Sequence, residues 1–174
     1  DQNNIHHVID AVLRFSRVLC VELVAYVPNL ALSARSLDAT ERAVDAIVFR
    51  RCYAVLFPFF TRLTQKQDLS LCAAYDNSTI AQKKVSHSAF DEARRGLLSA
   101  ADTKPPLAKL ELITTALRHL ARAGGEEDVD ADILLPLAVD CIRAAHISNL
   151  NAHLAYIEAF CHSRDFLGAQ GYAV

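Results

Sequence analysis

Hydrophobic residues recur every three or four positions along most of the chain, which is the spacing of one face of an α-helix. The first such segment covers residues 5–27, and Pro28 ends it. Its apolar face carries Ile5, Val8, Ile9, Val12, Leu19 and Leu23. No stretch alternates apolar and polar residues as a half-buried strand would. The pattern predicts an all-α fold, with an N-terminal helix or small helical bundle packed on a layered multi-helix core.

A second helix is predicted to begin at Asp38, because Asp38 and Glu41 have the spacing of a capping box. The helix continues through Val55. The Phe57-Pro58-Phe59-Phe60 run is predicted to break it, since a proline removes a backbone hydrogen bond. We interpret the aromatic residues of that run as a core plug between helices.

Residues 65–85 are polar and mixed, and they predict a loop with room for one helical turn. Ser88 is the expected N-cap of a helix that runs to Leu98. Pro105 and Pro106 start the next helix, because proline is favoured in a first helical turn. Gly124-Gly125 ends it.

The stretch from Asp130 to Tyr172 holds two more helical segments. Acidic residues at 130 and 132 precede an apolar run with helical spacing that reaches Ala145. Pro136 lies one turn after Asp132, so the two share a helix face. On spacing alone, Asp132 is a helix-start acid stabilised by the dipole, and Pro136 is a kink.

This region resembles the Vps-nine domain family. The family's Ala-Asp-Asp-aliphatic-Leu-Pro run is similar to residues 131–136, its Leu-x-Ser-Asn-Ile-x-Tyr-Ile helix to residues 150–157, and its Gly-Glu-x-Gly-Tyr element to residues 168–172. A weaker similarity extends upstream, through Lys109-Leu110-x-x-Ile113, to residue 38. Tyr156 and Ile157 are predicted core residues of the supporting helix.

The resemblance implies a guanine nucleotide exchange factor for Rab GTPases of the early endosome, the Rab-five class, which performs no covalent chemistry. It implies that Asp132 enters the nucleotide site of the GTPase, pairs with the phosphate-loop lysine and competes with magnesium and the β-phosphate. Pro136 and Tyr172 would help form the groove for the switch regions. Other residues of the same helix that could line the groove are Leu135, Val139 and Arg143.

A second function stays open, which is a helical module of the same family that binds a Rab GTPase or a scaffold without exchanging nucleotide. Ile133 replaces the second acid of the family run, Asp140 stands at a usually apolar position, and residues 146–148 replace an Asn-Pro-Pro loop. A metal-dependent hydrolase has the least support. The His146–His153 spacing and the acidic run at 126–132 lack the features of zinc and calcium sites. No metal or other cofactor is expected.

Composition excludes several other classes. The 174 residues are 52% hydrophobic and carry a net charge of −2, which predicts neither nucleic-acid binding nor a basic patch for anionic lipid. No apolar run is long enough to cross a bilayer, so no direct membrane insertion is expected. Five widely spaced cysteines favour a reducing cytoplasm.

The expected organisation is an N-terminal helical segment over residues 1–37, followed by a Vps-nine-like exchange domain over residues 38–174. The exchange domain is expected to be truncated at its C-terminal end, because the family pattern continues past Tyr172. The chain is expected to be monomeric and cytoplasmic, and to be recruited to endosomal membranes through regions outside it.

Overall fold

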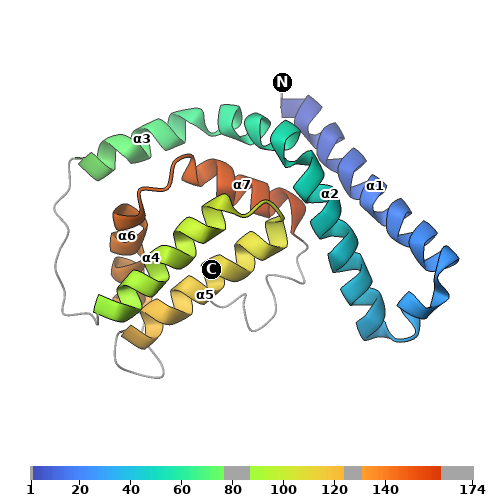
Figure 1. Ribbon diagram of the computed structural model, residues 1–174. Coiled ribbons are helices and arrows are strands. Elements are labelled where there is room, and N and C mark those ends of the chain that lie inside the picture. The colour runs from blue at the N-terminus through green and yellow to red at the C-terminus, as the bar shows by residue number, and fades with distance from the viewer. Residues whose placement is uncertain (1, 77–86, 124–130, 162–174) are drawn as a thin grey trace.

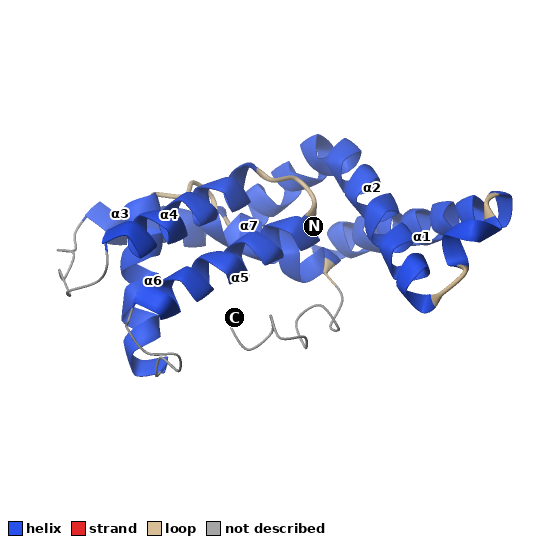
Figure 2. Ribbon diagram, turned by 60° about the horizontal axis from the view of Figure 1, so that its bottom comes forward, coloured by secondary structure: helices blue, strands red, loops and turns tan. Residues whose placement is uncertain are grey.

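In the computed structural model, the described residues form seven α-helices and one short 3₁₀ helix (Figure 1). The structure describes residues 2–76, 87–123 and 131–161. The helices are α1 (Gln2–Tyr26), η1 (Pro28–Ala31), α2 (Ala34–Leu63), α3 (Gln65–Asp76), α4 (His87–Asp102), α5 (Pro106–Ala123), α6 (Ala131–Ala145) and α7 (Leu150–Phe160). No strand occurs in these ranges, as the colouring of Figure 2 shows, which confirms the predicted all-α class.

The long helices α1 and α2 form a hairpin beside the other helices (Figure 1). The start of α2 differs from the prediction, because Ser33 caps it five residues before the expected capping box begins. Ser33 Oγ accepts a hydrogen bond from the Ser36 amide at 3.1 Å, and Ser36 Oγ accepts one from the Ser33 amide at 2.9 Å. Asp38 instead pairs with Arg42 Nε at 2.9 Å within the helix. The predicted capping box at Asp38 was therefore wrong.

The predicted break at the Phe57–Phe60 run was also wrong, since α2 continues through Pro58 to Leu63. The missing hydrogen bond costs about 3 kcal/mol, but continuing the helix packs Phe57 and Phe60 on α7. Phe60 lies edge-on to Tyr156, with ring centroids 5.5 Å apart. These two rings form part of an aromatic core between α2 and α7, as the core-plug interpretation proposed.

Residues 65–76 were predicted as loop but form α3, which packs on α7. A polar contact explains the error. Buried Asp68 of α3 accepts hydrogen bonds from the backbone amide of Asn151 at 2.8 Å and from its side chain at 3.0 Å. Asp68 therefore caps the N-terminus of α7 from another helix, which stabilises both. The remainder of the predicted loop lies outside the described residues.

Helices α4 and α5 form a closely packed second hairpin. At Gly96, an added Cβ would lie 3.2 Å from the Cβ of Ala116, so the hairpin depends on small residues at this crossing. Helix α5 begins at Pro106 as predicted. Helix α4 begins at His87, so the expected N-cap Ser88 lies inside it and that prediction was wrong. The predicted glycine stop at 124–125 lies outside the described residues.

Lys109 on α5 is fully buried and joins four helices. Its ammonium donates hydrogen bonds to the carbonyls of Ala100 and Ala101 in the last turn of α4, at 2.8 and 2.9 Å. It also lies 3.1 Å from Nδ1 of His153 on α7 and 5.3 Å from the ring centre of Tyr53 on α2. Burial lowers the pKa of Lys109 to about 8, so the side chain is still charged at neutral pH.

His153 completes this contact as an acceptor. The ammonium has only donors, so we infer that Nδ1 of His153 accepts and that the ring carries its proton on Nε2. The ring also stacks on Phe57, with centroids 4.6 Å apart. Burial, and then the charge of Lys109, lower the pKa of His153 to about 4.

Stability should consequently fall as the pH drops from about 6.5 to about 4. In that window His153 is protonated in the unfolded chain but not in the folded chain. Each pH unit of acidification therefore lowers the free energy of unfolding. We expect the free energy of unfolding to fall by about 2 kcal/mol more in the wild type than in His153→Asn between pH 7 and pH 5. Urea titrations at both pH values measure this difference. His7→Asn, at an exposed histidine of α1, should behave like the wild type, and equal losses in all three proteins would contradict the assignment.

Within the described ranges, no helix is both long enough and apolar enough to cross a membrane. Helix α2 runs across the proposed domain boundary between residues 37 and 38. The division into an N-terminal segment and an exchange domain stays a prediction.

Candidate functional site

Helix α6 carries most of the residues that the sequence singles out. It begins at Ala131, so Asp132 is its second residue, where the helix dipole favours an anion. The predicted helix start at Asp130 lies just outside the described residues.

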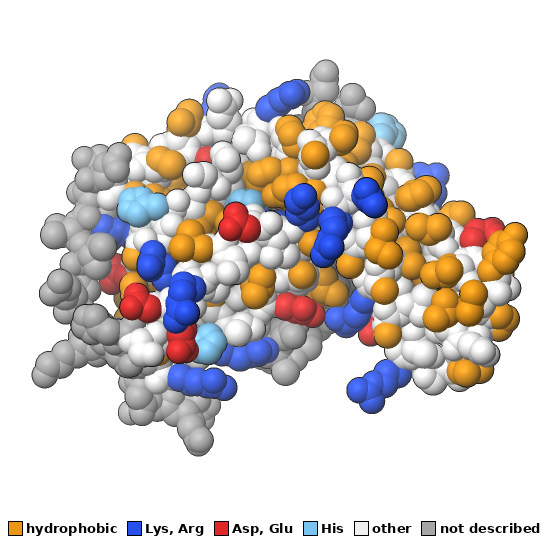
Figure 3. Space-filling view, viewed as in Figure 1, with side chains coloured by type: hydrophobic (Ala, Val, Ile, Leu, Met, Phe, Trp, Pro, Cys, Tyr) orange, Lys and Arg blue, Asp and Glu red, His pale blue; other side chains and the backbone are white. Residues whose placement is uncertain are grey.

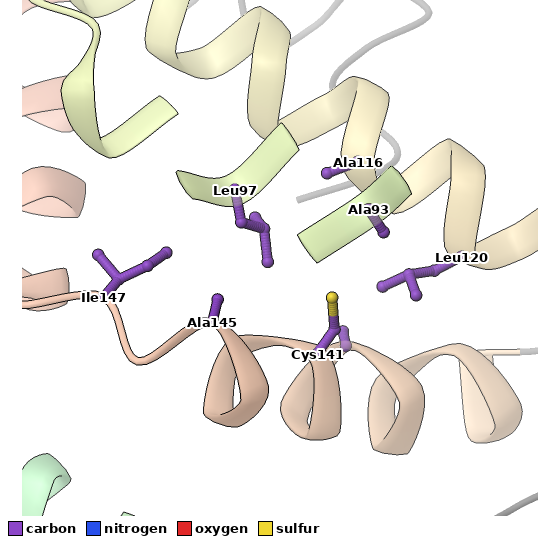
Figure 4. Close-up of a cluster of buried hydrophobic side chains, with 8 residues drawn as sticks. Ala93, Leu97, Ala116, Leu120, Cys141, Ala145 and Ile147 are labelled. Carbon is purple, nitrogen blue, oxygen red and sulfur yellow. The ribbon is translucent and has the colours of Figure 1, made fainter. Parts of the chain in front are cut away.

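One face of α6 is buried against the α4–α5 hairpin. The side chains of Ala138, Cys141 and Ala145 are buried there. In Figure 4, Cys141 and Ala145 point from α6 toward Leu97 and Leu120. This packing fixes the rotation of α6 about its axis, and it therefore determines which residues remain outside.

The opposite face of α6 is apolar and exposed. Leu135 is 68% exposed, Val139 is 47% exposed, and Pro136 is exposed between them. Residue 132 precedes Leu135 and Pro136 by about one turn, so the helical register places it on the same face. The structure therefore places three of the predicted groove residues, Leu135, Pro136 and Val139, on the same helix face as position 132.

Pro136 is the sixth residue of α6 and lies inside the helix. It has no N–H to donate to the carbonyl of residue 132, so the first turn of α6 lacks one internal hydrogen bond. Tolerating this exposed proline inside the helix costs stability, and a partner that binds its ring would offset part of that cost.

Arg143 differs from the other predicted groove residues. Its guanidinium lies 3.7 Å from the carboxylate of Asp140, and both side chains are largely buried. The pair lies toward the end of α6 near α3, where Tyr75 packs edge-on against His146. The structure thus places Arg143 at the end of the exposed face and ties it to Asp140, the residue that departs from the family pattern.

The predicted loop between the last two helices is confirmed and tightly built. His146 and Asn149 have positive φ angles of 47° and 57°, a conformation in which asparagine and histidine are enriched. Ile147 between them is buried in the core next to α6. Helix α7 follows, and its Tyr156 and Ile157 are buried, as predicted.

The described residues contain no group of three or more His, Cys, Asp and Glu side chains that could hold a metal ion. Nδ1 of His153 lies against Lys109, and His146 packs on Tyr75. The two histidines therefore have separate structural partners in the described part of the chain.

The family model of the vacuolar sorting protein 9 (VPS9) domain matches residues 90–174. Residues 90–174 belong to the Vps-nine domain family. The match begins in α4 and includes the whole of α6 and α7, and with them every predicted site residue. No curated protein matches the chain.

A Vps-nine domain implies guanine nucleotide exchange on a small GTPase as its general function, and this exchange needs no covalent chemistry. The exposed face of α6 therefore belongs to the part of the chain that carries the family's function. Tyr172 also falls within the match but outside the described residues, so its predicted place at the groove stays a prediction.

The sequence analysis missed two residues that position the Vps-nine helices. Asp68 holds the start of α7, and Lys109 joins α5 to α4, α7 and α2. Lys109 was noted only as part of a weak family similarity. A charged residue within the apolar face of a predicted helix was the available signal, because such a residue needs buried partners.

Proposed function

We propose that this chain accelerates GDP release from a Rab GTPase of the Rab-five class, and that α6 provides the contact surface. The observation that carries the proposal is the exposed apolar face of Leu135, Pro136 and Val139 within the family match. Burying one such side chain contributes about 1.5–3 kcal/mol. Three neighbouring apolar residues on one helix face therefore suit one wall of a groove that takes a partner.

Asp132 is the proposed catalytic residue, in the sense that it contacts the nucleotide site of the GTPase. It would pair with the phosphate-loop lysine and compete with magnesium and the β-phosphate. Its position at the start of α6 supports this role, because the helix dipole favours the charged carboxylate. A fixed anion beside the lysine performs part of the role of the phosphate. Nucleotide and exchange factor then weaken each other's binding by the same factor.

Tyr172 and Arg143 are proposed to contact the same GTPase surface further along the groove. We also propose that residues 38–174 act as the exchange domain, and that the protein works in the cytoplasm on early endosomes. These finer statements rest on the resemblance to the family.

The experiment that tests the contact surface replaces Leu135 and Val139 together by serine. Exchange should fall about tenfold or more, since two apolar contacts are lost. Stability should change by less than about 0.5 kcal/mol because both side chains are exposed. The measurement is the rate of fluorescent GDP release from a Rab-five-class GTPase. Leu154→Ser is the matched control, at an exposed leucine of α7. Unchanged exchange in the double variant would rule out this face of α6.

The second candidate is a module that binds a Rab GTPase or a scaffold without exchanging nucleotide. The Asp140–Arg143 pair favours it, because it places a buried ion pair on α6 where the family has an apolar residue. The two candidates differ in one measurement. A non-exchanging module would bind the GTPase with the same affinity whether or not nucleotide is present.

A further inference from the structure

The outer face of α2 carries apolar and basic residues along a single stripe. Ile47, Arg51, Val55 and Phe59 follow one another at intervals of four, and Arg62 comes three residues later. This spacing keeps all five on one side of the helix. Ile47 and Val55 are 61% and 68% exposed, and both arginines are exposed. The stripe is about 22 Å long, given a rise of about 1.5 Å per residue.

The charged residues of this part of the sequence have one sign. Residues 46–67 contain Arg50, Arg51, Arg62 and Lys66 but no Asp or Glu. None of the four forms a salt bridge with a described residue. Arg62 extends over the ring of Phe59, 5.9 Å from its centre. The net charge of −2 is a sum over the whole chain, so it did not predict this local basic patch.

Figure 3 shows Lys and Arg side chains over the middle of α2, with hydrophobic side chains beside them on the same side of the molecule. The stripe lies along the face of one helix. The cavity of about 240 Å³ beside α2 is lined by Arg42, Asp45 and Phe49, and no residue of the stripe lines it. An amphipathic partner helix needs an apolar groove. A flat anionic surface needs only matching charge and side chains that enter its boundary layer.

We propose that the stripe Ile47–Arg51–Val55–Phe59–Arg62 is a docking surface for membranes that contain anionic phospholipid. Arg50, Arg51, Arg62 and Lys66 attract the headgroups, and Ile47, Val55 and Phe59 enter the boundary between headgroups and acyl chains. Binding is peripheral, and α2 stays packed on α1 and α7. The stripe lies outside the Vps-nine match, and the inference does not depend on nucleotide exchange.

The test is co-sedimentation of the 174-residue chain with vesicles of phosphatidylcholine, with and without phosphatidylserine. We expect binding only to vesicles with phosphatidylserine, and its loss at about 1 M salt, where the Debye length is about 3 Å. Arg51→Gln with Arg62→Gln should weaken partitioning about 25-fold, at about fivefold for each basic residue. Val55→Ser should also weaken it without changing the melting temperature.

The matched control is Arg118→Gln with Arg122→Gln, which removes two exposed arginines from α5. It should stay within about twofold of the wild type. No binding to phosphatidylserine vesicles, or an equal loss in both double variants, would overturn the proposal. The stripe could instead bind a second copy of the chain. Sedimentation velocity without lipid tests this alternative. The proposal would also be overturned if the wild type is a dimer that does not bind vesicles and the Arg51→Gln, Arg62→Gln variant is a monomer. That result would assign the stripe to self-association.

Discussion

Replacing Asp132 by alanine is expected to remove most of the acceleration of GDP release while the chain stays folded. Removing one preorganised polar group from a catalytic site lowers rates by about a hundredfold. The same change at the first turn of a helix costs only about 0.3–1 kcal/mol of stability. Fluorescent GDP release from a Rab-five-class GTPase, with a melting curve for each protein, measures both quantities.

Two further variants make this test specific. Asp132→Asn keeps the shape and removes the charge, so it should be nearly as slow as Asp132→Ala. Asp91→Ala removes an exposed acid of α4 and should exchange nucleotide at the wild-type rate. If Asp132→Asn exchanges as fast as the wild type, the carboxylate does not act on the phosphate site.

Replacing Lys109 by methionine is expected to cause a large loss of stability. The side chain keeps most of its length but loses its hydrogen bonds to the carbonyls of Ala100 and Ala101 and its contact with His153. Leaving buried acceptors unpaired costs about 1–3 kcal/mol each, and relief of the buried charge offsets part of this. The net expectation is a loss of about 3 kcal/mol, or a melting temperature lower by about 6–12 °C.

Lys104→Met provides the control, because Lys104 is exposed just before α5. It should change stability by less than about 0.5 kcal/mol. Urea titration of the three proteins at pH 7 decides the result. A Lys109→Met variant as stable as the wild type would mean that the desolvation of the ammonium cancels its hydrogen bonds.

The helices that could be predicted are those that bury apolar side chains at regular spacing. Helix α5 buries Leu110, Ala116 and Leu120, and its start at the proline pair was correct. The loop before α7 and the buried Tyr156 also followed from the pattern. In these segments, local propensity and tertiary packing favour the same structure.

The helices that were missed depend on contacts between distant segments. Helix α3 has an exposed Leu69 and a buried Asp68, the reverse of an amphipathic pattern, and it is held by the amide of Asn151. Helix α2 continues past Pro58 because Phe57 and Phe60 pack on α7. Neither partner is near in the sequence, so local spacing could not show these contacts.

The candidate site was predictable in part. The spacing of residues 132 and 136 placed them on one helix face, and the structure shows that Pro136 is exposed there with Val139 beside it. The sequence could not show that Arg143 pairs with Asp140, because a charged residue at that spacing could equally face solvent. The buried Cys141 and Ala145 determine the rotation of α6, and only the packed structure reveals them.

The most direct measurement is the rate of GDP release from a panel of Rab GTPases, with increasing concentrations of the 174-residue chain. The proposed function predicts that release from a Rab-five-class GTPase rises with concentration of the chain, whereas release from Rabs of other classes stays near its intrinsic rate. It also predicts that added GDP weakens the complex of chain and GTPase, because the two ligands bind antagonistically. A chain that binds the GTPase but leaves GDP release unchanged at every concentration would contradict nucleotide exchange and would identify a binding module.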